Sequence, residues 1–415
     1  MTARHVVIVD PYSSGVMYAP ALRRAGFIPV AVRSTPLPVA QFTDAFRPDD
    51  FDLTLKQGED DLLARLRSLS VAAVIPGSES GVTLSDRLAA TLTPELANRP
   101  DLANCRNHKG HMAAAVAAAG LPVTPTVCVR EAAAAEDFVA RPDVAGQDLV
   151  IKPANSVSTD GVTLAPSGRG WREIVEGLLG RTNATGVRNN EVVLQRRLFG
   201  AEYVVNTFTA DGRHTVTDVC RYTKVSNGDS FAVYQDVEFL GADEPHVDQL
   251  IAYVRGALDA LGIRFGAAHT EVMLTSDGPR LIEVNSRLAG SGMEAAAELA
   301  TGDNAVRRLV RHLSGNRNHP DTFELHRRVR VAMFVAAHSG IATNVAAYEP
   351  IRALPTCRAL HLNVHDGDHI DATTDLLSSL RLGWALLAHK DPDKVERDYT
   401  RLRVYADAMK IVPEN

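Results

Sequence analysis

Apolar runs and longer periodic stretches alternate through the first part of the chain. Residues 5–9 form an apolar run, and a short Ser-Ser-Gly segment and a helical pattern follow it. Two further apolar runs cover residues 28–32 and 71–75, and the second ends in Pro-Gly-Ser-Glu. Strand, glycine-bearing turn, helix and strand in this order indicate parallel α/β structure, so we expect an α/β domain at residues 1–100.

The middle of the chain is expected to form one unit at residues 101–190 and a second at 191–325. Helices are expected at residues 108–119, 131–140, 171–179, 247–261 and 293–300. Strands are expected at residues 148–153, 191–194, 202–209, 267–274 and 281–285. Residues 155–161 are small and polar, and we expect a mobile loop there.

Short β-type runs dominate from residue 330 onward and predict a β-rich subdomain at residues 326–415. A closing helix is expected at 391–409, with Asp391 as its N-cap and Pro392 at its first helical position. The chain therefore combines α/β and α+β parts in its expected fold class.

The strands at 267–274 and 281–285 carry polar side chains where alternation collects them on one face. One face of the second strand is expected to hold Leu281, Glu283, Asn285 and Arg287. Its opposite, core-facing side is expected to hold Ile282 and Val284. On the first strand, Glu271 shares its face with His269.

The length of the turn decides whether Glu271 and Glu283 meet. A two-residue turn at Asp277-Gly278 would set Glu271 opposite Val284, on the wrong face. A three-residue loop at 276–278 would pair Glu271 directly with Glu283. Such loops favour glycine in a left-handed third position, which Gly278 fits, so we predict the three-residue loop.

Two carboxylates that face each other directly repel, and a cation resolves the conflict. Glu271, Glu283 and the amide oxygen of Asn285 are hard ligands that suit Mg²⁺ (or Mn²⁺) bound together with substrate phosphates. The plain alternative is an exposed hairpin face that carries ordinary polar residues.

The run HTEVMLTSDGPRLIEVNSRLAGSG, residues 269–292, resembles the metal hairpin of the ATP-grasp superfamily. The resemblance is strong over about residues 100–315 and weaker beyond. Within the superfamily the chain is most similar to L-amino acid α-ligases, which join amino acids into dipeptides. The motifs that carry this likeness are VIVD followed by SSG, then IPGSE and RLAG. The resemblance implies an ATP-grasp fold with an N-terminal parallel α/β domain and a C-terminal β-rich subdomain.

The resemblance also implies how ATP would be held between two α+β subdomains. Lys109 and Lys152 match the phosphate-gripping lysines, and Ser156 and Ser158 belong to the loop that would cradle the γ-phosphate. The adenine hinge would comprise Gln195, Arg196, Arg197 and Leu198, and Glu202 would bind the ribose hydroxyls. The alternatives are a solvated surface charge for each lysine and a strand-edge carboxylate for Glu202.

Arg287 lies two residues after Asn285, and the resemblance implies that it steadies the acyl phosphate and the transferred phosphoryl group. The next segment, Gly290, Ser291 and Gly292, precedes a helix whose N-terminal amides suit a carboxylate or phosphate. Ser291 is also a candidate N-cap of that helix. Weaker candidates are His269, Glu79, Tyr12 and Ser14 for the substrate pocket and Lys224 for the phosphates.

The bulk composition restricts the partners. A formal net charge of -6 does not favour nucleic acid or an anionic membrane, and four scattered cysteines indicate reduced thiols. The sequence shows no signal peptide or membrane-spanning run, so we expect a cytoplasmic protein with small-molecule substrates, and a homodimer is an open alternative to a monomer.

The resemblance implies an ADP-forming ligase that activates a carboxylate, most simply that of an amino acid, as an acyl phosphate and joins it to an amine. Two alternatives stay open. One is a biotin-carboxylase-like or purine-pathway ligase of the same superfamily. The other is a nucleotide-binding protein without catalysis, against which the set Lys152, Glu271, Glu283, Asn285 and Arg287 argues.

Overall fold

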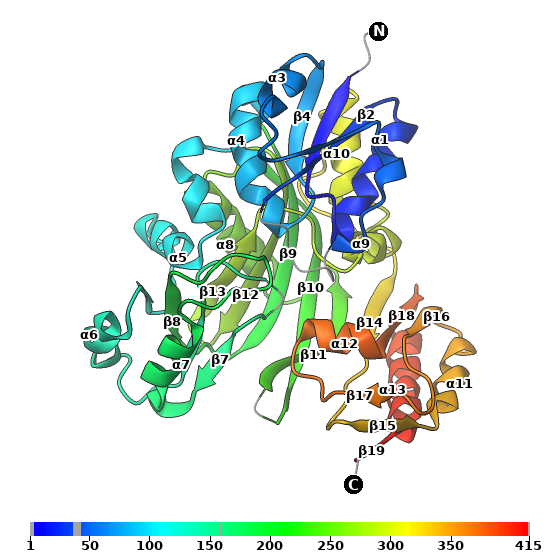
Figure 1. Cartoon of the computed structure of the whole chain (residues 1–415). Coiled ribbons are helices and arrows are strands. Elements are labelled where there is room, and N and C mark those ends of the chain that lie inside the picture. The colour runs from blue at the N-terminus through cyan, green and yellow to red at the C-terminus, as the bar shows by residue number, and fades with distance from the viewer. Residues whose placement is uncertain (1–3, 36–42, 158, 229, 414–415) are drawn as a thin grey trace.

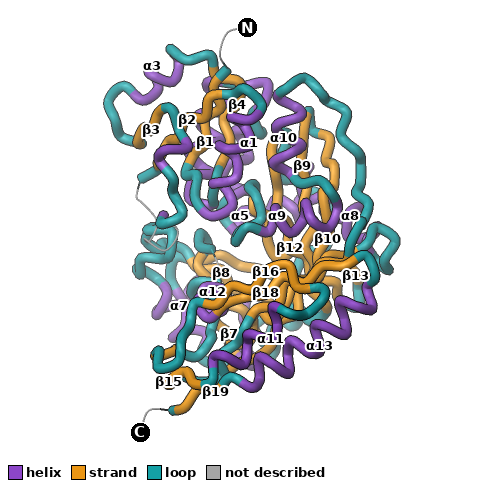
Figure 2. Tube along the Cα trace, turned by 90° about the vertical axis from the view of Figure 1, so that its right-hand side faces the viewer, coloured by secondary structure: helices purple, strands orange, loops and turns teal. Residues whose placement is uncertain are grey.

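The computed structural model describes residues 4–35, 43–157, 159–228 and 230–413. In these residues the strands form four sheets, which Figures 1 and 2 show from two directions. A parallel sheet lies at one end, a long antiparallel sheet runs through the middle, and two smaller sheets lie at the other end. Within the described residues, no helix is both long and apolar enough to cross a membrane.

The N-terminal sheet is parallel, as the sequence predicts, with strand order β3-β2-β1-β4. Its strands are β1 (His5–Val9), β2 (Ile28–Arg33), β3 (Leu53–Lys56) and β4 (Val71–Pro76). Its helices are α1 (Tyr18–Arg24), α3 (Leu62–Arg67) and α4 (Val82–Leu92). The loops that follow β1 and β4 meet so closely that a methyl group on Gly15 would lie 2.3 Å from the carbonyl oxygen of Gly77.

The central sheet has eight strands in the order β13-β12-β9-β10-β11-β14-β18-β16. Their bounds are β9 (Ala201–Ala210), β10 (Arg213–Asn227), β11 (Ser230–Leu240), β12 (Gly266–Thr275), β13 (Gly278–Asn285), β14 (Arg328–Met333), β16 (Cys357–Leu362) and β18 (Gly383–His389). The sheet thus joins the expected metal hairpin to strands of the C-terminal region. Where β11 meets β14, Arg330 pairs with the fully buried Asp236 at 2.9 Å, and the Tyr399 hydroxyl donates to the same carboxylate.

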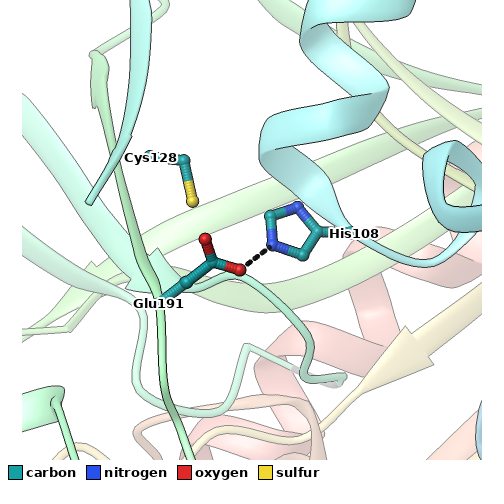
Figure 3. A group of neighbouring side chains, drawn as sticks. All are labelled: His108, Cys128 and Glu191. Atoms are coloured by element: carbon teal, nitrogen blue, oxygen red, sulfur yellow. Dashed lines mark hydrogen bonds and ion pairs between the residues drawn. The ribbon is translucent and has the colours of Figure 1, made fainter. Parts of the chain in front are cut away.

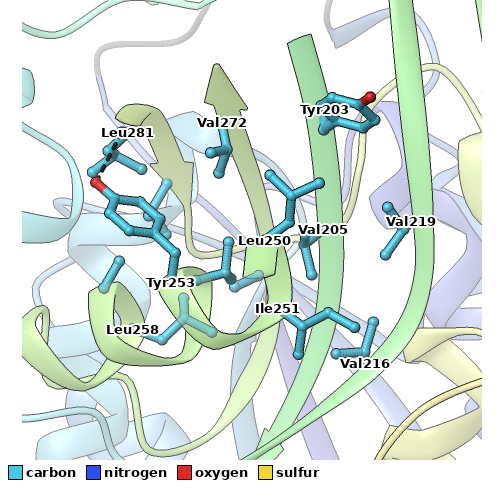
Figure 4. Packing of buried hydrophobic residues seen from close by; sticks show 14 of the residues in the cluster. Tyr203, Val205, Val216, Val219, Leu250, Ile251, Tyr253, Leu258, Val272 and Leu281 are labelled. Atoms are coloured by element: carbon cyan, nitrogen blue, oxygen red, sulfur yellow. Dashed lines mark hydrogen bonds between the residues drawn. The ribbon is translucent and has the colours of Figure 1, made fainter. Parts of the chain in front are cut away.

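Helices cover both faces of this sheet. The predicted amphipathic helix is confirmed as α8 (Val247–Ala260), which packs its apolar side on valines of β9, β10 and β12 (Figure 4). The opposite face carries α9 (Met293–Thr301) over β9, β10 and β14. A third helix, α10 (Ala305–Leu313), shares a core with β1 and α1 and so fastens the parallel sheet to the central one.

A smaller antiparallel sheet, with strand order β5-β8-β6-β7, lies beside the hairpin. Its strands are β5 (Thr126–Val129), β6 (Leu149–Pro153), β7 (Thr163–Ala165) and β8 (Val192–Arg196). The helices around it are α5 (Lys109–Ala118), α6 (Glu136–Val139) and α7 (Trp171–Leu178). The helix expected at 131–140 is therefore shorter, because a 3₁₀ turn at Ala132–Ala135 precedes α6.

The C-terminal region adds a three-stranded sheet, β17-β15-β19, and packs its own core against β14, β18 and β16. Its strands are β15 (Gly340–Thr343), β17 (His369–Ile370) and β19 (Lys410–Val412), and its helices are α11 (Glu349–Arg352), α12 (Leu376–Leu382) and α13 (Pro392–Ala408). The closing helix is confirmed, with Asp391 as N-cap and Pro392 at its first position.

The hairpin β12–β13 pairs Glu271 with Glu283 as predicted, but its turn and its second strand differ from the prediction. Glu271 lies directly opposite Glu283, but Thr275 pairs with Gly278, so the turn has two residues, Ser276 and Asp277. The predicted three-residue loop is wrong. A β-bulge instead adds one residue, Ile282, to the second strand and restores the register.

The bulge also corrects the predicted faces of β13. Leu281, which alternation placed on the metal face, pairs with Val272 and packs in the core beneath α8, although it also borders the cavity. Ile282, which alternation placed in the core, borders the cavity beside Glu283. One extra residue therefore reverses the alternation on the turn side of Glu283, while Glu283 and Asn285 keep the predicted face.

Candidate active site

A cavity of about 840 Å³ lies between the parallel sheet, the central sheet, the small sheet and α12. Most residues that the sequence singled out border it: Glu79, Lys152, Ser156, Gln195, Arg196, Arg197, Leu198, Glu202, His269, Glu271, Glu283, Asn285, Arg287, Gly290 and Ser291. Tyr12, Ser14 and Lys224 border it as well. Gly292 and Lys109 are not among the lining residues, and Ser158 lies outside the described residues.

The register of the central sheet arranges these side chains in rows, because residues directly opposite on antiparallel strands share a face. The first row runs Asn285, His269, Asn206 and Asp218. The second row runs Glu283, Glu271, Val204 and Cys220. The third row includes Met273, Glu202 and Tyr222. The expected metal ligands therefore lie at one end of two adjacent rows, next to the expected ribose carboxylate in the third.

Glu271 is held by a histidine two residues earlier on the same strand. Nε2 of His269 lies 3.5 Å from the Glu271 carboxylate. Burial alone would raise the pKa of Glu271, but the contact with His269 and the charges of Lys224 and Arg287 outweigh it and lower that pKa to about 2. Glu271 is thus fully ionised at neutral pH, as a metal ligand must be.

Glu283 pairs with Lys109 rather than with Glu271. The Lys109 ammonium lies 3.1 Å from Glu283 and donates a hydrogen bond of 2.6 Å to the carbonyl of Ser156. Lys109 therefore connects the first turn of α5 to both the hairpin and the segment after β6. It borders a small pocket that adjoins the main cavity, which puts it behind Glu283.

Lys152 lies at the end of β6 and is 6% exposed. Burial and the nearby charge of Lys109 lower its pKa to about 8, while Glu283 and Glu271 oppose the shift. Lys152 has no direct ion-pair partner within the part of the chain that the structure describes, so its buried ammonium favours an incoming anion, which would restore its ordinary basicity. The location therefore suits a phosphate oxygen.

Lys224 was only a weak candidate in the sequence. It lies inside β10, and its ammonium is 2.6 Å from Glu202 and 4.3 Å from the centre of the Tyr234 ring. Burial and the Glu271 charge nevertheless raise the pKa of Glu202, against the effect of Lys224. Lys224 therefore offsets part of the effect of burial on a carboxylate that lies where the ribose is expected.

The segment after β8 offers fewer backbone groups to an adenine edge than the sequence suggested. The amides of Arg196 and Arg197 donate to the carbonyls of Pro125 and Asp148. The amide of Leu198 has no hydrogen-bond partner among the described residues. Of these three amides, that of Leu198 is therefore the one open to a ligand in the described residues.

The Arg197 side chain lies at the mouth of the cavity. Its guanidinium lies 4.9 Å from the ring centre of Phe199 and 5.1 Å from that of Phe231. The same guanidinium forms an ion pair with Asp148 at 3.3 Å. Phe199 is 63% exposed, which is unusual for a phenylalanine. These aromatic and cationic groups form a wall that suits a planar base.

Arg287 lies at the boundary between the central and parallel sheets. Its Nε is 3.1 Å from Glu79, and another guanidinium nitrogen donates to the carbonyl of Leu288. Burial raises the pKa of Glu79, although the Arg287 guanidinium opposes the shift. The pair brings a residue of the loop after β4 within reach of the metal face.

The segment from Gly290 to Gly292 contacts the first loop of the chain. The amides of Ser291 and Gly292 donate to the hydroxyls of Ser13 and Ser14 at 3.2 and 2.9 Å. The expectation that Ser291 caps α9 is wrong. The N-cap position belongs to Gly292, in a left-handed conformation, because Ser291 itself has a positive φ of 55° and makes no side-chain cap.

Asp10 is a site residue that sequence reasoning missed. It is fully buried at the end of β1, and its carboxylate accepts hydrogen bonds from the amide and hydroxyl of Ser34 and the hydroxyl of Ser80. It thereby fixes the loops after β1, β2 and β4 where they border the cavity. Its position directly before Pro11, after four apolar residues, was the available signal.

A buried polar relay behind the metal face was also missed. The Asn206 amide donates to Asp218 at 2.7 Å, so its oxygen is left to accept from Nδ1 of His269 at 2.8 Å. Such a relay holds the ring of His269 beside Glu271. Nearby, burial and Asp218 raise the pKa of Glu294, on α9, to about 8.

The charges around the metal face are balanced. Four cationic side chains, Lys109, Lys152, Lys224 and Arg287, stand against four carboxylates, Glu79, Glu202, Glu271 and Glu283. A set of two carboxylates and an amide oxygen, Glu271, Glu283 and Asn285, is the hard donor set that Mg²⁺ requires, and the lysines supply the charge that phosphates require. The described residues therefore fit magnesium and a nucleoside triphosphate together.

Residues 145–295 match the family model of the ATP-grasp domain. This segment contains the small sheet, the hairpin and most of the cavity wall described above. Residues 145–295 therefore form an ATP-grasp domain, and the fold and enzyme class are those expected from the sequence.

Individual relatives extend the match to nearly the whole chain. Dapdiamide A synthase of Enterobacter agglomerans is 28% identical over 387 residues, which are 90% of this chain and 89% of that protein. The crystal structure of an L-amino acid ligase from Bacillus licheniformis matches with a TM-score of 0.70 at 18% identity and covers 100% of both chains. Carboxyaminoimidazole ribonucleotide synthase from Aspergillus clavatus, complexed with ATP, matches with a TM-score of 0.70 at 14% identity over 98% of this chain and 99% of that one.

Together these findings define an ADP-forming carbon–nitrogen ligase that joins a carboxylate to an amine. ATP-grasp enzymes use ATP and Mg²⁺ for this chemistry. The structural matches at 18% and 14% identity support the fold and leave the choice of substrates to the residues of this chain.

Proposed function

We propose that this enzyme activates the carboxylate of an amino acid as an acyl phosphate and joins it to the amine of a second substrate, giving an amide or dipeptide, ADP and phosphate. The observation that carries the proposal is the register of the hairpin. It places Glu271 opposite Glu283 and His269 opposite Asn285, with Lys152 and Arg287 around the same cavity. The likeness to dapdiamide A synthase and to an L-amino acid ligase supports it.

In this proposal Glu271, Glu283 and Asn285 hold Mg²⁺, which supplies charge neutralisation to the phosphates when bound. Lys152 and Lys109 bind phosphate oxygens, and Glu202 binds the ribose. Ser156, whose hydroxyl donates to Asp160, lies in the segment that would cover the γ-phosphate. Leu198 supplies the amide toward the adenine. The role of Lys109 rests on its contacts with Glu283 and the carbonyl of Ser156, and each of the other roles rests on where the residue lies in the cavity.

Arg287 is proposed to bind the oxygens of the carboxylate and of the transferred phosphoryl group. Its guanidinium presents several donors in one plane, which match paired oxygens better than an ammonium does. Glu79, 3.1 Å away, both positions this guanidinium and offers a carboxylate to a substrate ammonium group. An amino acid carries both groups, so the pair Arg287–Glu79 suits a zwitterionic substrate.

Exclusion of water is the remaining requirement, because an acyl phosphate hydrolyses readily. The cavity is bounded by the small sheet on one side and by the loops after β1 and β4 on the other. The amides of Ser291 and Gly292, which now donate to Ser13 and Ser14, lie at this boundary and are candidates for binding a substrate carboxylate.

The test is release of ADP in the presence of MgATP and a panel of amino acids, singly and in pairs, with products identified by mass spectrometry. The expected result is ADP release that needs both an amino acid and an amine and yields one amide per ADP. A bicarbonate arm and a ribosylamine arm are included. Turnover with either of these, and none with amino acids, would overturn the substrate assignment in favour of a carboxylase-like or purine-type ligase.

The metal assignment is tested separately with Glu283→Ala. The variant is expected to lose ADP release, whereas the control Glu298→Ala, on an exposed face of α9, should retain it. Full activity of the Glu283 variant would show that the metal lies elsewhere.

A further inference from the structure

A group of three metal-ligating side chains lies outside the proposed active site. His108, Cys128 and Glu191 place one ligand atom each within 4.8 Å of one another, and they are the one such group of His, Cys, Asp and Glu among the described residues (Figure 3). Nε2 of His108 is 2.9 Å from one oxygen of Glu191. The other oxygen accepts a hydrogen bond from Arg130 at 3.2 Å.

The three residues come from two parts of the molecule. His108 is the N-cap of α5, which packs on α8 and β13. Cys128 and Glu191 belong to the small sheet, on β5 and directly before β8. A shared ligand would therefore join the small sheet to the central part of the enzyme.

The sulfur of Cys128 lies directly against the first turn of α5. A methyl group on Gly110 would come within 2.7 Å of the Cys128 Cβ and 3.1 Å of its sulfur, so glycine allows this close approach. Burial, with a contribution from Glu191, raises the pKa of the Cys128 thiol to about 11. A cation would reverse this effect, and the positive end of α5 would favour the thiolate as well.

The donor set selects the kind of cation. One sulfur, one imidazole nitrogen and one carboxylate oxygen suit zinc and similar ions, whereas Mg²⁺ takes oxygen ligands. With usual bond lengths and a tetrahedral angle, the nitrogen and oxygen would stand roughly 3.4 Å apart. The observed 2.9 Å between His108 and Glu191 needs to open by only a small amount.

We propose that His108, Cys128 and Glu191 form a binding site for a divalent cation of the zinc class, distinct from the magnesium face of the hairpin. Arg130 holds the oxygen of Glu191 that points away from His108 and so orients the carboxylate. The fourth coordination position is open to water.

Binding changes the protonation of two ligands. The thiol of Cys128 releases its proton to solvent, so the site takes up cation in exchange for one proton. His108 must present a free Nε2 to the metal and carry its proton on Nδ1. The bond of 3.2 Å in which Nδ1 now accepts from the amide of His111 is then given up.

The site lies next to a nucleotide contact. Lys109 follows His108 directly, and its own amide donates to the carbonyl of Ala154. The amide of Ala154 in turn donates to the carbonyl of Glu191. A bound cation would therefore fix the base of the segment at 155–161 relative to α5.

The experiment is a titration of the full chain with Co²⁺ in excess Mg²⁺, followed by absorption. Binding at this site is expected to give a sulfur-to-cobalt charge-transfer band and the visible bands of tetrahedral Co²⁺, saturating at one ion per chain. Zn²⁺ is expected to abolish the bands and to raise the melting temperature. No saturable band in the unaltered protein would overturn the proposal.

Variants separate this site from chance thiol binding. Cys128→Ser should lose the charge-transfer band, and Glu191→Gln, which keeps the shape and the contact with Arg130, should weaken Zn²⁺ binding at least about tenfold. Cys105→Ser is the matched control and should behave like the unaltered protein. A band that persists in the Cys128 variant, disappears in the Cys105 variant, or keeps its full affinity in the Glu191 variant would refute the assignment.

Discussion

Raising the pH from 7 to 9 should weaken ATP binding about tenfold, because Lys152 loses its proton in the free enzyme over this range. Its pKa is lowered to about 8 by burial and by Lys109. A phosphate beside the ammonium would return the pKa to its ordinary value of about 10.4, so the complex keeps the proton that the free enzyme has released. Binding at high pH therefore requires proton uptake.

The magnitude follows from the two pKa values. With a pKa of about 8, Lys152 is about nine-tenths charged at pH 7 and about one-tenth charged at pH 9, whereas in the complex it is almost fully charged at both. The affinity ratio is then about ten, or about 1.4 kcal/mol. The number of protons taken up on binding should rise from about 0.1 at pH 7 to about 0.9 at pH 9.

Isothermal titration of MgATP in pairs of buffers with different ionisation heats measures this uptake directly. Lys152→Met should bind more weakly at pH 7 and take up no such proton at pH 9. Lys56→Met, on an exposed position of β3, is the control and should behave like the unaltered enzyme. Equal affinity at both pH values, or undiminished uptake in the Lys152 variant, would refute the reasoning.

Three further results are expected. Arg287→Lys keeps the charge but loses the planar guanidinium, so kcat for steady-state ADP release should fall about 10²–10³-fold while the KM for ATP changes little. An unchanged kcat would contradict the proposed role of Arg287. Glu202→Gln should raise the KM for ATP about 10–100-fold through weaker ribose binding, and an unchanged KM would remove it from the nucleotide site. Burial and Asp218 raise the folded pKa of Glu294 to about 8, above an unfolded value of about 4.3. The free energy of unfolding should therefore fall by about 1.4 kcal/mol for each unit that the pH rises between these two values. Denaturant titrations of Glu294→Gln should lack that slope, and an unaltered slope would assign it to another group.

The sequence predicted the parallel arrangement of the first sheet, the first helix beside it and the paired carboxylates, because each depends on local periodicity. It gave the wrong reason for the pairing of Glu271 with Glu283. Alternation with a period of two does not reveal this bulge, since the extra residue, Ile282, is apolar like Leu281 before it. The correct face of Glu283 resulted from two compensating features, a shorter turn and an added residue.

The long strands β10 and β11 were not anticipated for a related reason. β10 buries Thr217 and Asp218 completely or nearly so, which interrupts the apolar pattern that marks a central strand. The Asp218 carboxylate accepts hydrogen bonds from the neighbouring Thr217 and from Asn206, which is on another strand, so the pattern is explained only once the sheet order is known. Lys224 was undervalued for the same reason, since its partner Glu202 is on the adjacent strand.

The continuity of the central sheet from the metal hairpin to β16 limits how this enzyme can be divided or recombined. Truncation before β14 would leave β11 as an open sheet edge. It would also leave the buried Asp236 without its partners Arg330 and Tyr399. A chimera that borrows this region from a relative must therefore import a strand edge in the same register, together with a cation for Asp236. For directed evolution of substrate range, the C-terminal region is a structural partner of the catalytic sheet and not an exchangeable module.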